Sequence, residues 1–192
     1  MNLHSHEDDL PSWDEITDFM GKPDSHDEHL ETVERIETHI SLIFLAGDIA
    51  YKIKKPVVFP FLDYSTPEAR RRACINEVQL NRRTAPDQYL GVVPITYDKA
   101  RGLEISGSGE VVEWAVKMRR FPEGALYSEL AAADRLGSED YAELARAVHT
   151  FHDAAARRIE PGRAVAALSE LIAQNDAAFA HYPDVFAPDQ VR

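Results

Sequence analysis

Lys52 stands in a short stretch whose composition is typical of a buried β-strand. The stretch spans residues 47–57 and reads GDIAYKIKKPV. Because side chains alternate between the two faces of a strand, Lys52 is expected on the same face as Ala50 and Lys54. The opposite face is expected to carry Ile49, Tyr51 and Ile53. A lysine in such a place can bind an anion, and it needs an anionic partner because an unpaired buried charge is costly. The plainer alternative is an edge-strand lysine that prevents aggregation.

A carboxylate suited to pair with Lys52 lies on the next predicted helix. That helix spans residues 66–83, with Ser65 or Thr66 as N-cap and Pro67 in the first turn. At about 100° per residue, its apolar side chains form one broad arc. The arc consists of Ala69, Ala73, Cys74, Val78 and Leu80. Glu77 falls inside this arc, where it is either paired or a partly exposed side chain that reaches solvent. The sequence therefore predicts an ion pair between Lys52 and Glu77.

Length, composition and charge limit the classes of protein to which the chain can belong. Its 192 residues, 44% of them hydrophobic, suffice for one domain or for a lobe and part of another. The single cysteine, Cys74, excludes an internal disulfide and is expected to pack in the core. A cytoplasmic location is expected, because no membrane-span-length apolar run or secretory signal pattern is present. The formal net charge of −12 opposes general binding to nucleic acid or anionic membranes.

The apolar periodicities predict an antiparallel sheet of five or six strands with one long helix. The predicted strands span residues 35–40, 41–46, 49–57, 90–97, 103–105 and 111–121. Gly47 and Asp48 form a two-residue hairpin turn, because glycine readily adopts positive φ. Pro94 indicates an edge or a bulge in its strand. One face of the last strand is expected to carry Val112, Trp114, Val116 and Met118.

The segments that flank the sheet are predicted to be a polar tail and several helices. Residues 1–11 read as a tail, in which His4 and His6 could bind a stray metal ion. A helix is expected at residues 12–20, packed on the main body. The charged linker that follows contains two histidines expected at the surface, His26 and His29. Later helices are expected at residues 126–133, from Ser138 onward, and after Gly162.

Residues 34–122 resemble the N-terminal lobe of the aminoglycoside phosphotransferase-like kinases. The more similar members form a bacterial group that is often fused to a P-loop kinase domain. The resemblance is carried by ERIETHISLIFLAGDIAYKIKKPV, FLDYST, RRRACINEVQLNRR, YLGVVPIT and EWAVKMRRFP, and it continues more weakly through AVHTFHDAA. Protein-kinase-like enzymes place an Ala-x-Lys arrangement on one face of their third strand. The resemblance therefore implies an α+β, protein-kinase-like fold.

The resemblance implies three parts of the chain. Residues 1–33 are an acidic tail with a short helix, residues 34–122 are the kinase-like N-lobe, and residues 123–192 are the helical beginning of a truncated C-lobe. We therefore expect the chain to be the front part of a longer protein. The intact mass of the native protein is the most direct test of this expectation.

The resemblance also assigns nucleotide-binding roles. Lys52 is expected to contact the α- and β-phosphates of ATP, Glu77 to hold Lys52, and Ala50 to leave room for adenine. The backbone near His39 to Ser41 takes the place of a glycine-rich phosphate loop. Backbone groups expected to bind adenine belong to Met118, Arg119, Arg120 and Phe121.

The sequence lacks the motifs that perform phosphoryl transfer. It contains neither an H-G-D-type catalytic loop nor a G-x-x-x-x-G-K-[ST] motif, so no catalytic residue and no metal ligand is assigned within it. The expected function is the nucleotide-binding portion of an ATP-dependent small-molecule phosphotransferase, inactive alone, with ATP and Mg²⁺ as cofactors. Its acceptor is an unidentified small hydroxylated molecule, and self-association through an exposed lobe surface is a further expectation. The alternative is a non-catalytic kinase-like module that binds nucleotide or a partner.

Overall fold

The computed structural model describes residues 10–26, 30–122, 124–156 and 162–181. Two compact units divide the chain, Met1–Arg146 and Ala147–Arg192. His4, His6 and His29 lie outside the described residues, and so do their predicted roles. The described residues form a mixed α+β structure, as predicted.

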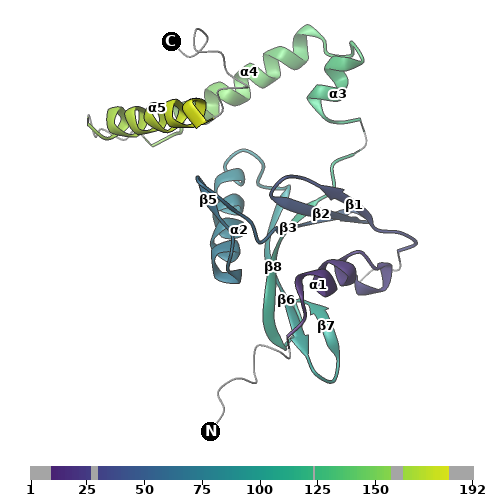
Figure 1. Ribbon diagram of the computed structural model, residues 1–192. Coiled ribbons are helices and arrows are strands. Elements are labelled where there is room, and N and C mark those ends of the chain that lie inside the picture. Colours follow the sequence, from purple (N-terminus) through teal and green to yellow (C-terminus); the bar gives the residue numbers. More distant parts are fainter. Residues whose placement is uncertain (1–9, 27–29, 123, 157–161, 182–192) are drawn as a thin grey trace. The chain divides into compact units, whose positions relative to one another are not determined.

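A curled antiparallel sheet of six strands forms the body of the first unit, in the order β1-β2-β3-β8-β6-β7 (Figure 1). Its strands are β1 (Glu34–Glu37), β2 (Ser41–Ala46), β3 (Ile49–Lys54), β6 (Tyr89–Asp98), β7 (Gly102–Ile105) and β8 (Glu110–Arg119). The prediction of five or six antiparallel strands is confirmed. A separate two-stranded sheet, β4 (Val58–Phe59) with β5 (Leu62–Asp63), lies in the connection between β3 and the next helix, where no strand pair was predicted.

The β2–β3 hairpin forms as its sequence predicts. The two strands pair from Ser41 opposite Lys54 to Ala46 opposite Ile49. Gly47 occupies the turn with φ of 57°, a conformation that glycine adopts without a Cβ penalty. β3 ends at Lys54, earlier than expected, and Pro56 follows without a backbone N–H for the ladder.

A β-bulge in β8 changes which face its side chains occupy. Ile95 pairs with Glu113 and Thr96 pairs with Val111, so Val112 is an extra residue on β8. The expectation that Val112 shares a face with Trp114 is therefore wrong. Val112 packs in the cluster that contains Ala115, whereas Trp114 packs against the cluster of Cys74, Val78 and Val116.

Helix α1 (Trp13–Met20) packs against the larger of the two apolar clusters. Its N-terminus has a capping box, in which the Ser12 hydroxyl accepts from Glu15 N–H and the Glu15 carboxylate accepts from Ser12 N–H. Ile16 and Met20 are buried among β2, β3, β6 and β8 residues, so the predicted packing of this helix on the main body is confirmed.

The short 3₁₀ turn after α1, Pro23–Ser25, leads into His26. The His26 ring lies 5.3 Å from the ring of Tyr51, and its Nε2 is 3.0 Å from the carbonyl oxygen of Met20. His26 is half-buried, so the expectation of a surface histidine is wrong.

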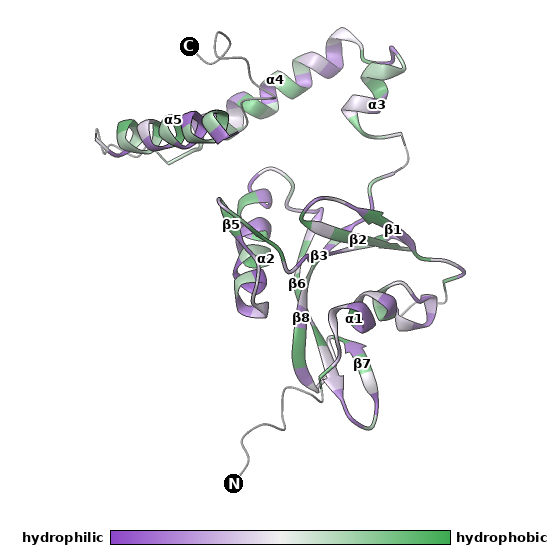
Figure 2. Cartoon of the chain, viewed as in Figure 1, coloured by the Kyte–Doolittle hydropathy of each residue, from purple (hydrophilic) through white to green (hydrophobic). Residues whose placement is uncertain are grey.

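Helix α2 (Pro67–Asn81) covers the other face of the sheet. Thr66 is its N-cap, and the Thr66 hydroxyl accepts from Ala69 N–H. The buried positions are Arg70, Cys74 and Val78, at intervals of four residues. Leu80 is 61% exposed, so its expected place in the apolar arc is wrong. Leu80 lies about 200° around the helix from Val78, which directs it away from the buried stripe. Figure 2 shows that α2 is largely hydrophilic.

Three helices follow the sheet in sequence, namely α3 (Tyr127–Ala132), α4 (Ser138–Asp153) and α5 (Arg163–His181). Their positions agree with the predicted helices, and α4 begins at Ser138. None of the three contains a buried residue among those the structure describes. Across the described helices, none combines the length and apolar character needed to cross a membrane.

Candidate functional site

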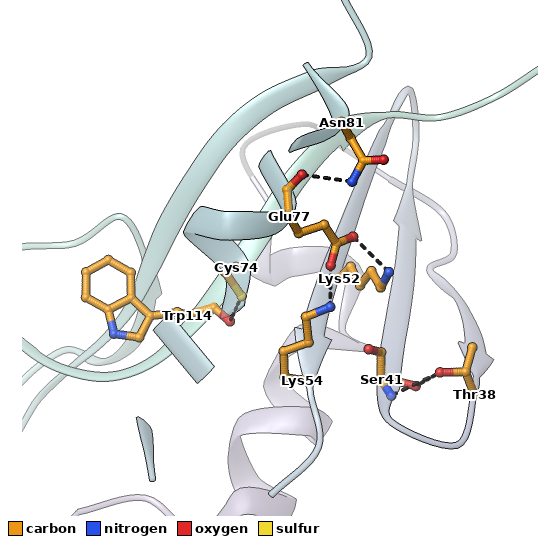
Figure 3. Close-up of polar contacts among 8 residues, drawn as sticks. All are labelled: Thr38, Ser41, Lys52, Lys54, Cys74, Glu77, Asn81 and Trp114. Carbon is orange, nitrogen blue, oxygen red and sulfur yellow. Dashed lines mark hydrogen bonds and ion pairs between the residues drawn. The ribbon is translucent and has the colours of Figure 1, made fainter. Parts of the chain in front are cut away.

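The predicted ion pair between Lys52 and Glu77 is present. Lys52 Nζ lies 2.8 Å from Glu77 Oε1, which joins the middle of β3 to the sheet-facing side of α2 (Figure 3). The side chains of Lys52 and Glu77 are 26% and 14% exposed, respectively. The pair is therefore largely shielded from water, while Lys52 keeps access to solvent.

Lys54 binds the second oxygen of the same carboxylate, a contact that the sequence interpretation did not assign. Its Nζ hydrogen-bonds to Glu77 Oε2, and its side chain is only 4% exposed. It also lies 6.0 Å from the centre of the Tyr64 ring, within range of a cation–π contact. The sequence feature that could have predicted this contact is the alternation of side chains along a strand, because residues 52 and 54 lie on the same face.

The two lysines determine the ionisation of Glu77. Burial alone would raise the pKa of this carboxyl, but hydrogen bonds and charge attraction from Lys52 and Lys54 outweigh burial and lower its pKa. The backbone carbonyl of Glu77 also accepts a hydrogen bond of 2.8 Å from Asn81 Nδ2. The carboxylate is thus held as an anion between two cations.

Ser41 lies directly opposite Lys54 in the sheet, at the start of β2. Its backbone N–H donates to Thr38 Oγ1 at 3.0 Å, and Thr38 N–H donates to the Ser41 carbonyl at 2.9 Å. These bonds close the β1–β2 turn, so the predicted phosphate donor at Ser41 is already in use. The Ser41 hydroxyl is buried and has no hydrogen-bond partner among the described residues.

Ala50 and Met118 are paired neighbours on β3 and β8, next to the segment predicted to bind adenine. In that segment, Arg119 N–H donates to the Gln88 carbonyl at 2.9 Å, and Arg120 N–H donates to the Asp48 carbonyl at 2.8 Å. Both N–H groups therefore serve the fold. Phe121 lies beyond the end of β8 and is 52% exposed, so its backbone lies outside the sheet.

A second buried ion pair was missed from the sequence. Arg70 Nε and Nη2 each lie 2.7 Å from Glu113 Oε2, and the glutamate is fully buried. Arg70 Nη1 also donates to the Tyr64 carbonyl at 2.8 Å, and its guanidinium lies 5.9 Å from the Trp13 ring. Burial raises the pKa of Glu113, and Arg70 opposes that rise. The sequence feature that could have predicted a buried Arg70 is its spacing of four and eight residues from Cys74 and Val78, which places all three on one face of the helix.

Cys74 is a core residue rather than a reactive thiol. Its side chain is fully buried, its Sγ contacts the Trp114 carbonyl at 3.9 Å, and burial raises its thiol pKa to about 12. A thiol with such a pKa is not a nucleophile near neutral pH. The prediction of core packing is confirmed.

Comparison with known proteins gives relatives of greater length. The chain is 34% identical over 159 residues to uncharacterized protein Rv2004c of Mycobacterium tuberculosis (strain H37Rv) and to uncharacterized protein Mb2027c of Mycobacterium bovis. Each alignment covers 81% of this chain and 30% of the relative. No family model matches the chain. No solved structure matches it either. The chain thus spans about a third of the length of the curated relatives it matches.

Proposed function

We propose that this chain is the nucleotide-binding portion of an ATP-dependent small-molecule phosphotransferase of the aminoglycoside phosphotransferase-like kind. The observation that supports the proposal is the Lys52–Glu77 pair, which joins a sheet strand to the helix packed on that sheet. Ala50 precedes Lys52 by two residues on the same strand face. In kinases, a strand lysine held by a helix glutamate is the arrangement that contacts nucleotide phosphates.

In this proposal residues 34–122 are a protein-kinase-like N-lobe and residues 123–192 begin a C-lobe. Lys52 neutralises charge on the α- and β-phosphates of ATP, and Glu77 orients Lys52. Ala50 and Met118 contact adenine, and the backbone N–H of Phe121, which lies beyond the end of β8, donates to it. Bound Mg²⁺ would shield charge on the phosphates, through ligands other than the residues described above.

The residues present fit a phosphate group. Lys52 is 26% exposed, so its ammonium can be reached from solvent without breaking the sheet. The chain's own contribution is to bind and orient the nucleotide. The base for the acceptor hydroxyl belongs to an H-G-D-type segment, which this sequence does not contain.

Nucleotide binding by the 192-residue chain tests the proposal. Lys52→Met should weaken ATP binding about tenfold or more, because it removes a charge-assisted contact to phosphate. The control is Lys117→Met, whose ammonium lies over the Tyr51 ring 5.6 Å from its centre. The control should bind ATP as the parent does. Equal ATP affinity of the Lys52→Met variant and the parent, measured by calorimetry, would refute the assignment.

The second candidate is a non-catalytic module that binds nucleotide or a partner. It is favoured by the absence of an H-G-D-type segment and of a G-x-x-x-x-G-K-[ST] motif from the sequence. The two candidates differ in one measurable activity. Transfer of the ATP γ-phosphate to a hydroxylated small molecule by a longer protein containing this region would eliminate the module.

A further inference from the structure

The candidate site contains more positive than negative charge. Lys52 and Lys54 both bind the carboxylate of Glu77, one at each oxygen. A single lysine–glutamate pair would be electrically neutral, whereas this triad retains one positive charge. Because none of the three side chains is more than 26% exposed, water and salt screen this charge less than they would at the surface.

The neighbouring titratable groups among the described residues do not neutralise the excess charge. Burial raises the pKa of Tyr64 and of Tyr89, so both phenols are neutral near pH 7. Cys74 is also neutral there, because its pKa is about 12. The Glu113 carboxylate forms an ion pair with Arg70, so its charge is already balanced. The triad therefore carries an unbalanced positive charge, which favours the approach of an anion.

The two lysines differ in their access to such an anion. Lys54 is 4% exposed and is also in cation–π range of Tyr64, so it is a fixed part of the interior. Lys52 is 26% exposed and is the one that a ligand can reach. If Lys52 turned to a ligand, Glu77 would still keep Lys54 as its partner. Drawing Lys52 away would therefore not leave a buried carboxylate unpaired, which is the costly situation.

We infer that Lys54 is a positioning residue that makes this site select polyphosphate. It stays paired with Glu77 when Lys52 turns to a ligand. It also supplies the positive charge that favours ligands with more phosphate groups. This inference rests on the proposed nucleotide function and deepens it. Lys54 acts without touching the ligand, through Glu77 and through its charge. The affinity of the site should therefore rise with each added phosphate, from adenosine through AMP and ADP to ATP.

The experiment measures the dissociation constants of adenosine, AMP, ADP, ATP and inorganic tripolyphosphate for the 192-residue chain. EDTA is present, so that each phosphate-bearing probe is the metal-free anion, and the salt concentration is fixed. The variants are Lys54→Met and Lys54→Gln. The control is Lys55→Met, which removes a lysine one position along that pairs with Glu37 instead. Lys54→Gln removes the charge and keeps a hydrogen-bond donor on a side chain one atom shorter, so it serves if the methionine variant does not fold.

The expected result is a loss confined to the anions. Either Lys54 variant should bind ATP and tripolyphosphate about tenfold or more weakly, because a unit charge at short range in a partly buried site is worth at least that factor. Adenosine binding should stay within about twofold, since a neutral ligand gains little from the charge. The Lys55→Met variant should keep the parent's rise in affinity from adenosine to ATP.

Several outcomes separate this inference from the proposed function. If the parent binds ATP and both Lys54 variants keep the parent's rise from adenosine to ATP, the inference is overturned and nucleotide binding stands. If the parent binds adenosine and ATP equally well, the inference is likewise overturned. If tripolyphosphate binds in a Lys54-dependent manner and ATP binds no more tightly than tripolyphosphate, the anion site stands and the nucleotide proposal fails. If the parent binds neither ATP nor tripolyphosphate, both are overturned.

Discussion

Glu77 is the residue on which both lysines of the site depend. It accepts hydrogen bonds from Lys52 and Lys54 through its two oxygens, and only 14% of its side chain is exposed. Because the two cations stabilise the ionised carboxylate more than burial destabilises it, the folded protein holds Glu77 at a pKa below its ordinary value of 4.5. A lowered carboxyl pKa links protonation to unfolding.

The sign of this linkage gives a prediction for acid unfolding. A carboxyl whose pKa is depressed by folding contributes stability that is present above about pH 4.5 and is lost as pH falls through the folded-state pKa. Glu77→Gln should therefore lose less stability than the parent between about pH 7 and about pH 3. Urea unfolding across this range measures the effect.

Glu68→Gln is the control for the Glu77 experiment, because Glu68 lies on the exposed side of the same helix and pairs only with Arg71 among its described contacts. It should follow the pH profile of the parent. Identical pH profiles for Glu77→Gln and the parent would mean that the two lysines do not perturb Glu77 in solution.

Among the elements, Arg70 connects helix α2 to both β8 and helix α1. It reaches Glu113 on β8 and the ring of Trp13 on α1. This route is open because β3 ends at Lys54 and its pairing with β8 stops at Ala115, so β8 has no β3 partner near Glu113. The ion pair thus lies beside β8 at the point where its pairing with β3 has ended, while its pairing with β6 continues.

Breaking that pair should destabilise the fold strongly. Arg70→Met leaves the fully buried Glu113 without its cation, and we expect a loss of about 3–5 kcal/mol in the free energy of unfolding. Urea denaturation near neutral pH measures this loss. The double variant Arg70→Met with Glu113→Leu should recover most of it, because an apolar pair can replace a buried ion pair with little penalty.

Arg71→Met is the matched control for Arg70→Met. Arg71 lies 4.9 Å from the Trp114 ring and its side chain is 41% exposed, so its loss should be about 0–1 kcal/mol. A loss for Arg70→Met no larger than that of this control would contradict the structural role assigned to the buried pair.

At the scale of the whole molecule, the described core lies within the sheet and its two covering helices. Both apolar clusters consist of residues between Trp13 and Met118. Helix α5, in contrast, has four exposed apolar residues, namely Val165, Leu168, Leu171 and Ile172. Because both clusters lie between Trp13 and Met118, residues 10–122 are a candidate folding unit.

We expect a fragment of residues 10–122 to fold cooperatively. Thermal unfolding followed by circular dichroism tests this, with a sigmoidal transition as the expected outcome. A fragment of residues 34–122 is the comparison, because it lacks Ile16 and Met20, which are 4% and 0% exposed. Burial of each such side chain contributes about 1.5–3 kcal/mol, so the shorter fragment should melt at a lower temperature. Equal melting temperatures would show that α1 does not stabilise the sheet.

Features that depend on local pattern were predictable from the sequence alone. The Gly47 turn, the period-two faces of β3 and the start of α2 each follow from a few adjacent residues, and the structure then selects Thr66 over Ser65 as the N-cap. The Lys52–Glu77 pair was also predictable, because each residue was out of place in its own element and a charge in such a place requires a partner.

The way in which the elements pack against one another was not predictable from local pattern and required the folded structure. The register of β6 on β8 makes Val112 a bulge residue. Val112 therefore packs in the cluster that contains Ala115, and not on the face of Trp114 as expected. The placement of α2 gives Glu77 a second lysine, Lys54, and gives Arg70 a buried partner on β8. These contacts join residues far apart in the chain, and their geometry depends on where strands end and how helices lie on them. No periodicity within a single element encodes that geometry, because it is a property of the assembled sheet.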